Sequence, residues 1–339
     1  MNTRQIKFNP EDHEEFVSLR NQLHKEGRLG GSDVGVSAGV SKYKSPRRFY
    51  EEFVGNIKAP DISSKQSIKD GVRNEQTVAD YFEERTGKKV HRVNHILVTD
   101  NSDVLFASID RKVENEDAGL ECKTANALNW DAFKDGRLPA TYAMQVKTYM
   151  KVTGYRTWYV YVWVMGCAEY CYLFTMDDVE KPEWCDTLVK VTQEELDECE
   201  NAANRFLYCV RNLQPPTEDG SDDETEVLNE LFPESRTDEE IELVNVSESD
   251  IQQIDLLKEH IRVAETNIAE IENRIKDEMG EHAVAVCGGR RITWKNNKPT
   301  SKVDYKKMVA DMNVAPETLK RYTELKPGAR ILKIGKEGK

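Results

Sequence analysis

The chain has 339 residues, with 48 lysine and arginine residues against 61 aspartate and glutamate residues, and a formal net charge of −13. Residues 215–250 hold fourteen acidic residues and one basic residue, so this segment alone accounts for the net charge, and the acidic average does not exclude a nucleic-acid partner. No apolar run approaches the about 20 residues that a membrane-spanning helix needs, and the polar first residues do not resemble a signal peptide. We therefore expect a cytoplasmic protein with no membrane partner, and its seven cysteines, which lack Cys-x-x-Cys spacing, indicate neither a disulfide framework nor a zinc site.

Residues 1–214 predict a domain that mixes helices and strands. Apolar spacing and capping residues predict helices over 11–26, 30–38, 68–86, 141–153 and 193–213, with a further helix that begins at Ser45 and Pro46. Short extended runs follow at 95–98, 104–109 and 119–123. The aromatic and β-branched run at 156–165 is typical of a buried strand, and it is expected to pair with 168–174 through a turn at Gly166.

The remainder of the chain divides into an acidic linker and a C-terminal region. The segment 215–250 has little apolar content and predicts a solvated linker. In the C-terminal region, 251–339, isoleucines at intervals of seven predict a heptad helix over 251–280, which forms either a coiled coil between chains or a helix packed on its own domain. The tail at 281–339 has a net charge of +8 and a predicted strand pair over 283–287 and 290–294. Such a tail either holds DNA phosphates or docks on the acidic linker of its own or a neighbouring chain.

The residues with the clearest chemical meaning are Asp110, Glu121 and Lys123. Asp110 ends one apolar strand and Glu121 lies in the next, so their carboxylates are expected at one edge of a buried sheet, where they can hold a hard divalent cation. Lys123 follows Glu121 by two residues and therefore shares its face of the strand. The pattern predicts metal-dependent phosphodiester hydrolysis. It is not specific by itself, because an acidic residue two positions before a lysine occurs five times in the chain. The alternative is that these residues form an exposed hairpin held by salt bridges.

Four further motifs surround these residues, in a defined order. They are GRLGGSDVG at 27–35, SKYKSP at 41–46, GVRNEQTVADYFEERTG at 71–87 and YAMQVKTYMKVTG at 142–154. Together with Asp110, Glu121 and Lys123, they resemble the YqaJ-type viral recombinase family, the phage exonucleases related to lambda exonuclease within the PD-(D/E)XK nuclease superfamily. The resemblance covers about residues 18 to 210 and implies an α/β (α+β) fold with a mixed central sheet flanked by helices.

Residue by residue, the resemblance assigns the following roles. Asp110 and Glu121 are metal ligands together with the backbone carbonyl of Cys122, and Lys123 assists the nucleophilic water. Glu75 holds a second metal ion or its water, the alternative being an ordinary exposed glutamate. Gln145 supports the catalytic face from the following helix, the alternative being a surface amide.

The resemblance also implies a site for the 5′-terminal phosphate of DNA. Ser32 lies at a glycine-rich helix start, where free backbone N–H groups attract anions, and Arg28 is its expected cationic partner. The alternative role of Ser32 is helix capping. Lys42 and Tyr43 either contact the DNA backbone or form a solvated loop.

The function implied is a Mg²⁺-dependent 5′-to-3′ exonuclease of phage or prophage type, with Mn²⁺ as a substitute. It would act on double-stranded DNA ends and leave 3′ overhangs for a single-strand annealing protein, and a homotrimer is expected from the resemblance. Two alternatives remain open, an endonucleolytic or Cas4-like nuclease on the same fold and a non-catalytic DNA-binding scaffold.

Overall fold

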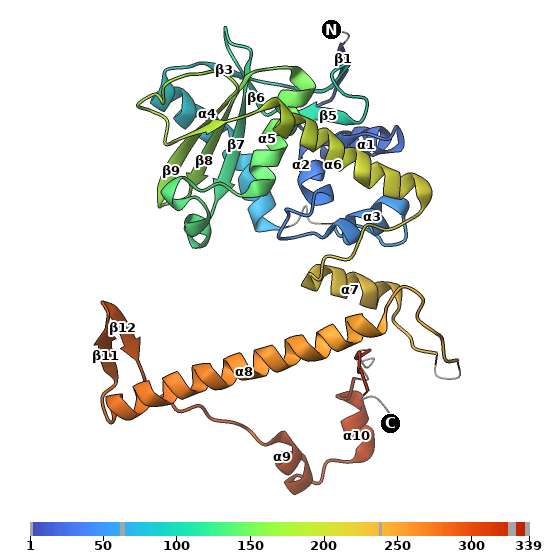
Figure 1. Ribbon diagram of the computed structural model, residues 1–339, viewed down its shortest axis with the longest axis vertical. Coiled ribbons are helices and arrows are strands. Elements are labelled where there is room, and N and C mark those ends of the chain that lie inside the picture. Colours follow the sequence, from blue (N-terminus) through green and yellow to red (C-terminus); the bar gives the residue numbers. More distant parts are fainter. Residues whose placement is uncertain (1–2, 62–64, 237–238, 325–329, 336–339) are drawn as a thin grey trace. The chain divides into compact units, whose positions relative to one another are not determined.

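The chain divides into two compact units, Met1–Phe232 and Pro233–Lys339, each of which is described by itself. The computed structural model describes residues 3–61, 65–236, 239–324 and 330–335 (Figure 1). Within these ranges, no helix combines the length and the apolar character required to cross a membrane.

The first unit contains both helices and strands. Its helices are α1 (His13–Lys25), α2 (Gly31–Ser37), α3 (Pro46–Val54), α4 (Gln66–Thr86), α5 (Ala140–Thr153), α6 (Gln193–Asn212) and α7 (Asp222–Leu231), with 3-10 turns η1 (Ala127–Ala132) and η2 (Lys134–Gly136). Its strands are β1 (Thr3–Lys7), β2 (Leu29–Gly30), β3 (Val90–Arg92), β4 (His95–Thr99), β5 (Leu105–Ser108), β6 (Arg111–Val113), β7 (Ala118–Ala125), β8 (Thr157–Val164), β9 (Ala168–Thr175) and β10 (Thr187–Lys190).

The strands form two sheets. Six of them pair in the order β10-β9-β8-β7-β6-β3, and four pair in the order β1-β4-β5-β2. Strands β7 and β8 are parallel, with Glu121 opposite Val160, so the chain must cross over between them, and α5 makes that crossover. Strands β8 and β9 are antiparallel and join at Gly166, as predicted. This mixed α+β architecture confirms the predicted fold class.

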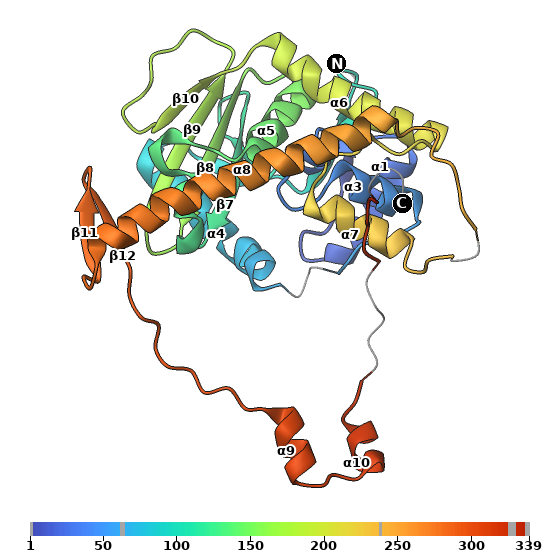
Figure 2. The same ribbon diagram turned by 60° about the horizontal axis from the view of Figure 1, so that its bottom comes forward.

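Helices cover both faces of the larger sheet, which explains why β8 is apolar without alternation. On one face, Trp158, Val160 and Val162 of β8 pack in the same cluster as residues of α5 and α6. On the other face, α4 lies against β7 and β8 (Figure 2). Tyr159 and Tyr161 pack there with residues of α4. Each fully buried side chain of this kind contributes about 1.5–3 kcal/mol to the free energy of unfolding, so β8 anchors the domain.

A close contact across the sheet requires glycine on the strand that carries the predicted catalytic residues. A Cβ atom at Gly119 in β7 would lie 2.3 Å from Cζ2 of Trp158, which is far inside van der Waals contact. The fully buried indole of Trp158 therefore packs directly over the backbone of β7. This contact locks β7 against β8 two residues before Glu121.

The boundary of the first unit lies further along the chain than predicted, because part of the expected acidic linker is folded. Helix α7, within 215–250, packs on α3 with Val227 fully buried. The carboxylate of Asp223 accepts a hydrogen bond from the backbone N–H of Ser45 at 2.7 Å and pairs with Arg48 at 2.5 Å. Composition alone indicated solvated carboxylates, whereas the carboxylate of Asp223 is the partner of Arg48 on α3.

The second unit contains one long helix and several short elements. Helix α8 (Glu248–Met279) begins with a capping box at Ser247 and ends before Gly280, close to the predicted bounds. It is followed by the hairpin of β11 (Val284–Cys287) and β12 (Arg290–Thr293), as predicted, and by α9 (Tyr305–Asp311) and α10 (Pro316–Arg321). The heptad residues Ile261 and Ile268 of α8 are more than half exposed.

Candidate active site

Two strands and one helix bring together most of the predicted catalytic residues. Asp110 lies where β5 passes into β6, and Glu121 and Lys123 lie on β7, the next strand of the six-stranded sheet. Because side chains alternate along a strand, Glu121 and Lys123 point to the same face. Helix α5 carries Gln145 to that face, where it contacts both of them.

The contacts among these residues form a continuous network. Nζ of Lys123 lies 2.6 Å from Oε1 of Glu121 and donates a hydrogen bond to Oε1 of Gln145 at 3.1 Å. The amide Nε2 of Gln145 donates to Oε1 of Glu121 at 2.7 Å and to the hydroxyl of Tyr149 at 2.9 Å. The ammonium group of Lys123 also lies 4.6 Å from the ring centroid of Tyr142, a cation–π distance. Gln145 is therefore a buried bridge between strand and helix, and not a surface amide.

Asp110 is held by the backbone of the neighbouring strand. Its Oδ2 accepts a hydrogen bond from the backbone N–H of Cys122 at 2.9 Å. Burial and the nearby carboxylates of Glu121 and Glu75 nevertheless raise the pKa of Asp110 well above its ordinary value. Burial also raises the pKa of the Cys122 thiol. The site therefore concentrates negative charge that the protein only partly compensates.

Lys123 supplies the compensating charge that is present. Burial disfavours its ammonium group, but the carboxylates of Glu121 and Asp110 outweigh that effect and raise the pKa of Lys123 above its ordinary value. At neutral pH, Lys123 is therefore a fixed cation and hydrogen-bond donor. It can orient a water molecule through a donated hydrogen bond.

The donor set fits a divalent cation at Asp110 and Glu121. Glu121 is 2 % exposed, and within the described ranges its Oε2 is a buried carboxylate oxygen with no hydrogen-bond partner. Hard divalent cations prefer such carboxylate oxygens. A third carboxylate does not join them, since no group of three or more His, Cys, Asp or Glu side chains gathers at metal-binding distance in the part of the chain that the structure describes.

Glu75 explains why the third carboxylate is missing from this group. It lies on α4, and its carboxylate pairs with Arg111, a buried residue of β6. Arg111 also donates to the backbone carbonyl of Asp110 at 2.9 Å and to the side chain of Gln76 at 3.2 Å. Arg111 was not among the residues predicted from the sequence. Its place directly after Asp110 is the signal that could have identified it, since this cation connects β6 to α4.

A second cluster lies at the start of α2 and is built around Asp33. Both oxygens of this buried carboxylate are satisfied: Oδ1 lies 2.7 Å from Nη2 of Arg20, and Oδ2 lies 2.9 Å from Nε2 of His24 and accepts from the backbone N–H of Gly30 at 3.0 Å. Burial disfavours the charged form, but these partners hold the pKa of Asp33 well below its usual range.

Ser32 is exposed beside this cluster. The N-cap of α2 is Gly30, and Asp33, not Ser32, supplies the capping side chain. The hydroxyl of Ser32 lies 3.4 Å from Nη2 of Arg20, so Arg20 is the cation next to it. Arg20 and His24 are four residues apart on α1 and therefore share one face. That spacing is the signal by which the sequence could have identified Arg20.

Arg28 does not occupy the position that the sequence analysis expected. Its Nη1 donates to the backbone carbonyls of Ser102 at 2.9 Å and Leu105 at 3.2 Å. The side chain therefore ties the start of β2 to the loop before β5. Lys42 and Tyr43, in the loop before α3, are exposed.

Helix α5 connects the two clusters. A Cβ atom at Gly31 would lie 2.7 Å from Cε1 of Tyr149 and 3.0 Å from the backbone carbonyl of Gln145, both on α5. Only a glycine allows α2 to approach α5 this closely. The position of Ser32 relative to Glu121 therefore depends on the packing of α2 against α5.

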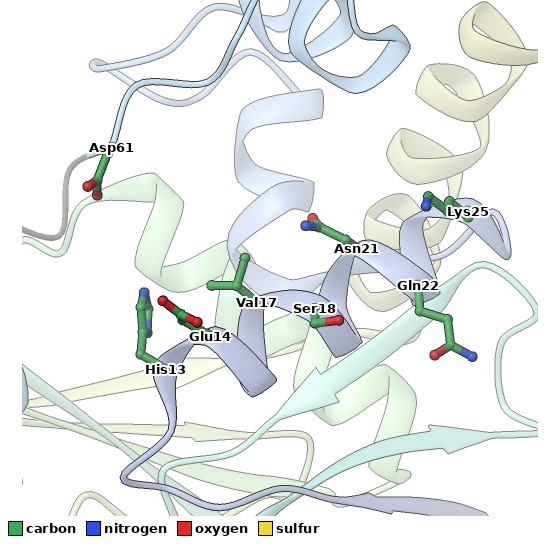
Figure 3. A pocket seen from close by; sticks show the side chains of 8 residues that line it. All are labelled: His13, Glu14, Val17, Ser18, Asn21, Gln22, Lys25 and Asp61. Carbon is green, nitrogen blue, oxygen red and sulfur yellow. The ribbon is translucent and has the colours of Figure 1, made fainter.

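A groove in the first unit lies away from both clusters. This groove, of about 760 Å³, follows the outer face of α1 and extends to Asp61 (Figure 3). It is lined by His13, Glu14, Val17, Ser18, Asn21, Gln22, Lys25 and Asp61, and it includes none of the residues described above. The groove is therefore separate from the candidate site, which is a cluster of carboxylates and cations. Such a cluster suits a polyanionic substrate better than a small apolar ligand.

Comparisons with known proteins find three kinds of similarity. The model of the YqaJ-like viral recombinase domain matches residues 19–156, a span that contains Ser32, Glu75, Asp110, Glu121 and Gln145. Two solved structures are also similar: an alkaline exonuclease from Laribacter hongkongensis (17 % identity, TM-score 0.45, covering 59 % of this chain and 93 % of that one) and a phage related exonuclease from Haemophilus somnus 129PT (10 % identity, TM-score 0.39, covering 55 % and 96 %).

The chain is also similar in sequence to YqaJ of Bacillus subtilis (strain 168). The two chains are 30 % identical over 307 residues, which is 90 % of this chain and 91 % of the relative. A match of that length extends beyond the first unit into the second. The chain therefore belongs to the YqaJ-like viral recombinase family.

Proposed function

We propose that this protein is a Mg²⁺-dependent DNA exonuclease that degrades the 5′-ended strand of duplex DNA. The observation that carries the proposal is the cluster of Asp110, Glu121, Lys123 and Gln145, in which one buried oxygen of Glu121 has no partner among the described residues. When bound by these carboxylates, Mg²⁺ would neutralise their charge and stabilise the charge that develops on a phosphodiester during in-line attack. Mn²⁺, which takes similar oxygen ligands, is expected to substitute.

The protein's own residues supply orientation. The ammonium group of Lys123 holds a water molecule by hydrogen bonding, and it stabilises the negative charge of the phosphodiester as the new bond forms. Gln145 holds Lys123 and Glu121 at a fixed distance from each other, because it bonds to both. The pairing of Glu75 with Arg111 fixes β6, and with it Asp110, against α4.

The polarity of the proposed reaction rests on Ser32 and Arg20. An exposed hydroxyl beside a guanidinium group is suited to hold a terminal phosphate, because both donate hydrogen bonds to anionic oxygens. Arg20 replaces Arg28 in this role. A protein that holds the 5′ end here while it hydrolyses that strand would leave 3′ overhangs.

The test uses linear duplex DNA with Mg²⁺ and compares Lys123→Ala with Lys190→Ala. Lys190 is an exposed lysine of β10 that pairs with Asp178, so the control removes the same charge away from the site. We expect Lys123→Ala to lower the rate of strand resection by about 10²- to 10³-fold, the usual cost of removing one preorganised donor. We expect Lys190→Ala to match the unmodified protein.

Substrate comparisons separate this proposal from the alternatives. Duplexes with a 5′-phosphate should be degraded faster than duplexes with a 5′-hydroxyl, and Ser32→Ala should reduce that preference. Cleavage of closed circular DNA would instead identify an endonuclease. A protein that binds duplex DNA but shows no hydrolysis with Mg²⁺ or Mn²⁺ would be a scaffold, and the proposal would be wrong.

The proposal includes two features of assembly. The 3′ overhang is the substrate of a single-strand annealing protein, which we propose as a partner, and a homotrimer is the proposed oligomeric state. Light scattering coupled to size-exclusion chromatography measures the mass of the assembly directly. A mass of one chain, 38.9 kDa, would contradict the trimer without affecting the chemistry at Asp110 and Glu121.

A further inference from the structure

Charge is strongly segregated within the second unit. Helix α8 carries nine acidic and four basic residues, whereas residues 282–303 carry five basic residues and no acidic one. We call residues 282–303 the basic arm. It contains the hairpin of β11 and β12 and an extended segment that runs towards α9.

The hairpin presents two arginines at its tip. Gly288 and Gly289, with φ of +55° and +76°, form a two-residue turn of the kind that suits a twisted hairpin. In the register of the two strands, Arg290 lies opposite Cys287 and Arg291 lies opposite Val286. Successive residues of a strand point to opposite faces, so the two arginines place positive charge on both faces of the hairpin.

The cations of the basic arm make no ion pairs with other described residues. Within the described ranges, none of its five Lys and Arg side chains makes an ion pair or a side-chain hydrogen bond, and all five are exposed; they are Arg290, Arg291, Lys295, Lys298 and Lys302. In particular, none of them pairs with a carboxylate of α8. By contrast, Arg20, Lys123 and Arg111 in the first unit each pair with a carboxylate.

Exposed aromatic rings bracket the extended segment. Trp294, which ends the hairpin, is 48 % exposed, and Tyr305, at the start of α9, is 68 % exposed. Lys295, Lys298 and Lys302 lie between them in sequence. Rings interleaved with unpaired cations are the combination that binds single-stranded nucleic acid, because bases stack on the rings while the cations contact the backbone phosphates.

We infer that the basic arm is a second nucleic-acid site, and that it binds single-stranded DNA. The inference goes beyond the proposed function, since it concerns a different unit of the chain and needs no hydrolysis. Single-stranded DNA is preferred over duplex because the faces of duplex bases are stacked on one another and cannot contact Trp294. In the reaction proposed above, the strand that resection exposes is such a ligand.

Binding is measured on the full-length protein by fluorescence anisotropy, with labelled oligo(dT) and labelled duplex DNA in EDTA so that no hydrolysis occurs. The arm variant replaces four cations by alanine: Arg290, Arg291, Lys295 and Lys298. The matched control removes four cations from α8: Lys258, Arg262, Arg274 and Lys276. Both variants have the same net charge, so a difference between them reports position and not total charge.

The arm variant should bind oligo(dT) more weakly than the control variant, and with a shallower dependence on salt. Each cation that contacts phosphate on a single strand contributes about 0.7 to the slope of log affinity against log salt, so the slope should fall by up to about 3. The control variant should keep the slope of the unmodified protein. Equal losses in the two variants, or no loss in either, would overturn the inference.

The role of the ring is tested separately. Trp294→Ala should weaken oligo(dT) binding by about tenfold, because stacking of one base is lost, whereas Trp294→Phe should keep most of the affinity. Duplex binding should change little in either variant. A loss of duplex affinity as large as that for oligo(dT) would overturn the assignment to single strands.

These outcomes can be distinguished from failure of the proposed function. A protein that binds oligo(dT) through the basic arm but does not resect DNA would contradict the nuclease proposal and support the arm. If instead the protein resects DNA and the arm variant binds oligo(dT) as well as the unmodified protein does, the nuclease proposal would be supported and the inference about the basic arm would be wrong.

Discussion

Glu121 and Asp33 are both buried carboxylates near α5, and they differ in how completely the protein satisfies them. Both oxygens of Asp33 have close partners, from Arg20, His24 and the backbone of Gly30. In Glu121, Oε1 has two partners and Oε2 has none among the described residues. A fully satisfied carboxylate stabilises a fold, whereas one that is left partly unsatisfied beside a second acid is suited to bind a cation.

The pKa of Asp33 and that of Asp110, the acid beside Glu121, are shifted in opposite directions. The partners of Asp33 keep its pKa well below the usual range, while burial and the carboxylates of Glu121 and Glu75 raise the pKa of Asp110 well above it. Negative charge on Asp33 therefore stabilises the folded protein, whereas negative charge on Asp110 opposes folding, an effect that the proposed cation would relieve. Substitutions in the two clusters should consequently have effects of opposite sign on stability.

The largest expected effect on stability is at Asp33. Asp33→Asn leaves Arg20 buried without its counter-ion, and removing one partner of a buried pair costs about 3–5 kcal/mol in the free energy of unfolding. The matched control is Asp178→Asn, which breaks a fully exposed pair with Lys190 and should therefore cost much less than Asp33→Asn. Urea denaturation at pH 7 measures both, and equal costs would show that Asp33 is not a structural carboxylate.

The cost of Asp33→Asn should depend on pH. Because the pKa of Asp33 is lower in the folded than in the unfolded protein, its contribution is fully present above the ordinary aspartate pKa of about 4 and is lost as the pH falls towards the folded value. The difference in stability between the unmodified protein and the variant should therefore shrink below pH of about 4. A difference that grew with acidity would contradict the assignment.

The second effect concerns the contact between α2 and α5. Gly31→Ala forces a Cβ atom against Tyr149 and the backbone of Gln145, and such overpacking costs about 1–3 kcal/mol. The control is Gly71→Ala in α4, where a Cβ atom meets nothing within 4 Å. That control should stabilise the protein by about 0.5–1 kcal/mol, because alanine favours a helix more than glycine does. Thermal unfolding of the two variants gives the comparison.

The smallest effect is expected at Asp110 and has the opposite sign to that at Asp33. In EDTA at neutral pH, Asp110→Asn removes the repulsion with Glu121 and should raise the free energy of unfolding by an amount on the order of 1 kcal/mol. The gain should shrink as the pH falls, because a raised pKa means that the unmodified side chain takes up a proton in the folded state. If Asp110→Asn instead lowered the stability in EDTA, Asp110 would be a carboxylate that stabilises the fold, as Asp33 is.

Sequence periodicity predicted most of the first unit because its longer elements are strongly patterned. The apolar stripe of α4 and the aromatic run of β8 are long enough to identify a helix and a strand without tertiary information. The strands β1, β3 and β10 were missed, since three to five residues with exposed or half-buried side chains carry no clear period. Helix α7 was missed because its acidic residues indicate a linker unless Ser45 and Arg48 are known to face it.

The residues of the candidate site also divide into those that the sequence identified and those that required the folded structure. Asp110, Glu121, Lys123 and Gln145 were identified from motifs, and the structure brings their side chains together. Two other predictions placed Arg28 beside Ser32 and Glu75 at a second metal ion or its water. They depended on which cation pairs with which acid, and that pairing is decided by the folded structure. Arg20 took the place of Arg28 beside Ser32, and Arg111 paired with Glu75.

The shared use of α5 has a consequence for the product. Ser32 is positioned by the approach of Gly31 to α5, and Glu121 is bonded by Gln145 one turn before Tyr149 on the same helix. The separation between the group proposed to hold the 5′ end and the group proposed to hold the metal ion is therefore determined by a rigid helix and not by loops. In such an enzyme, the length of the fragment released at each cut is constant, because a helix cannot stretch to admit another nucleotide.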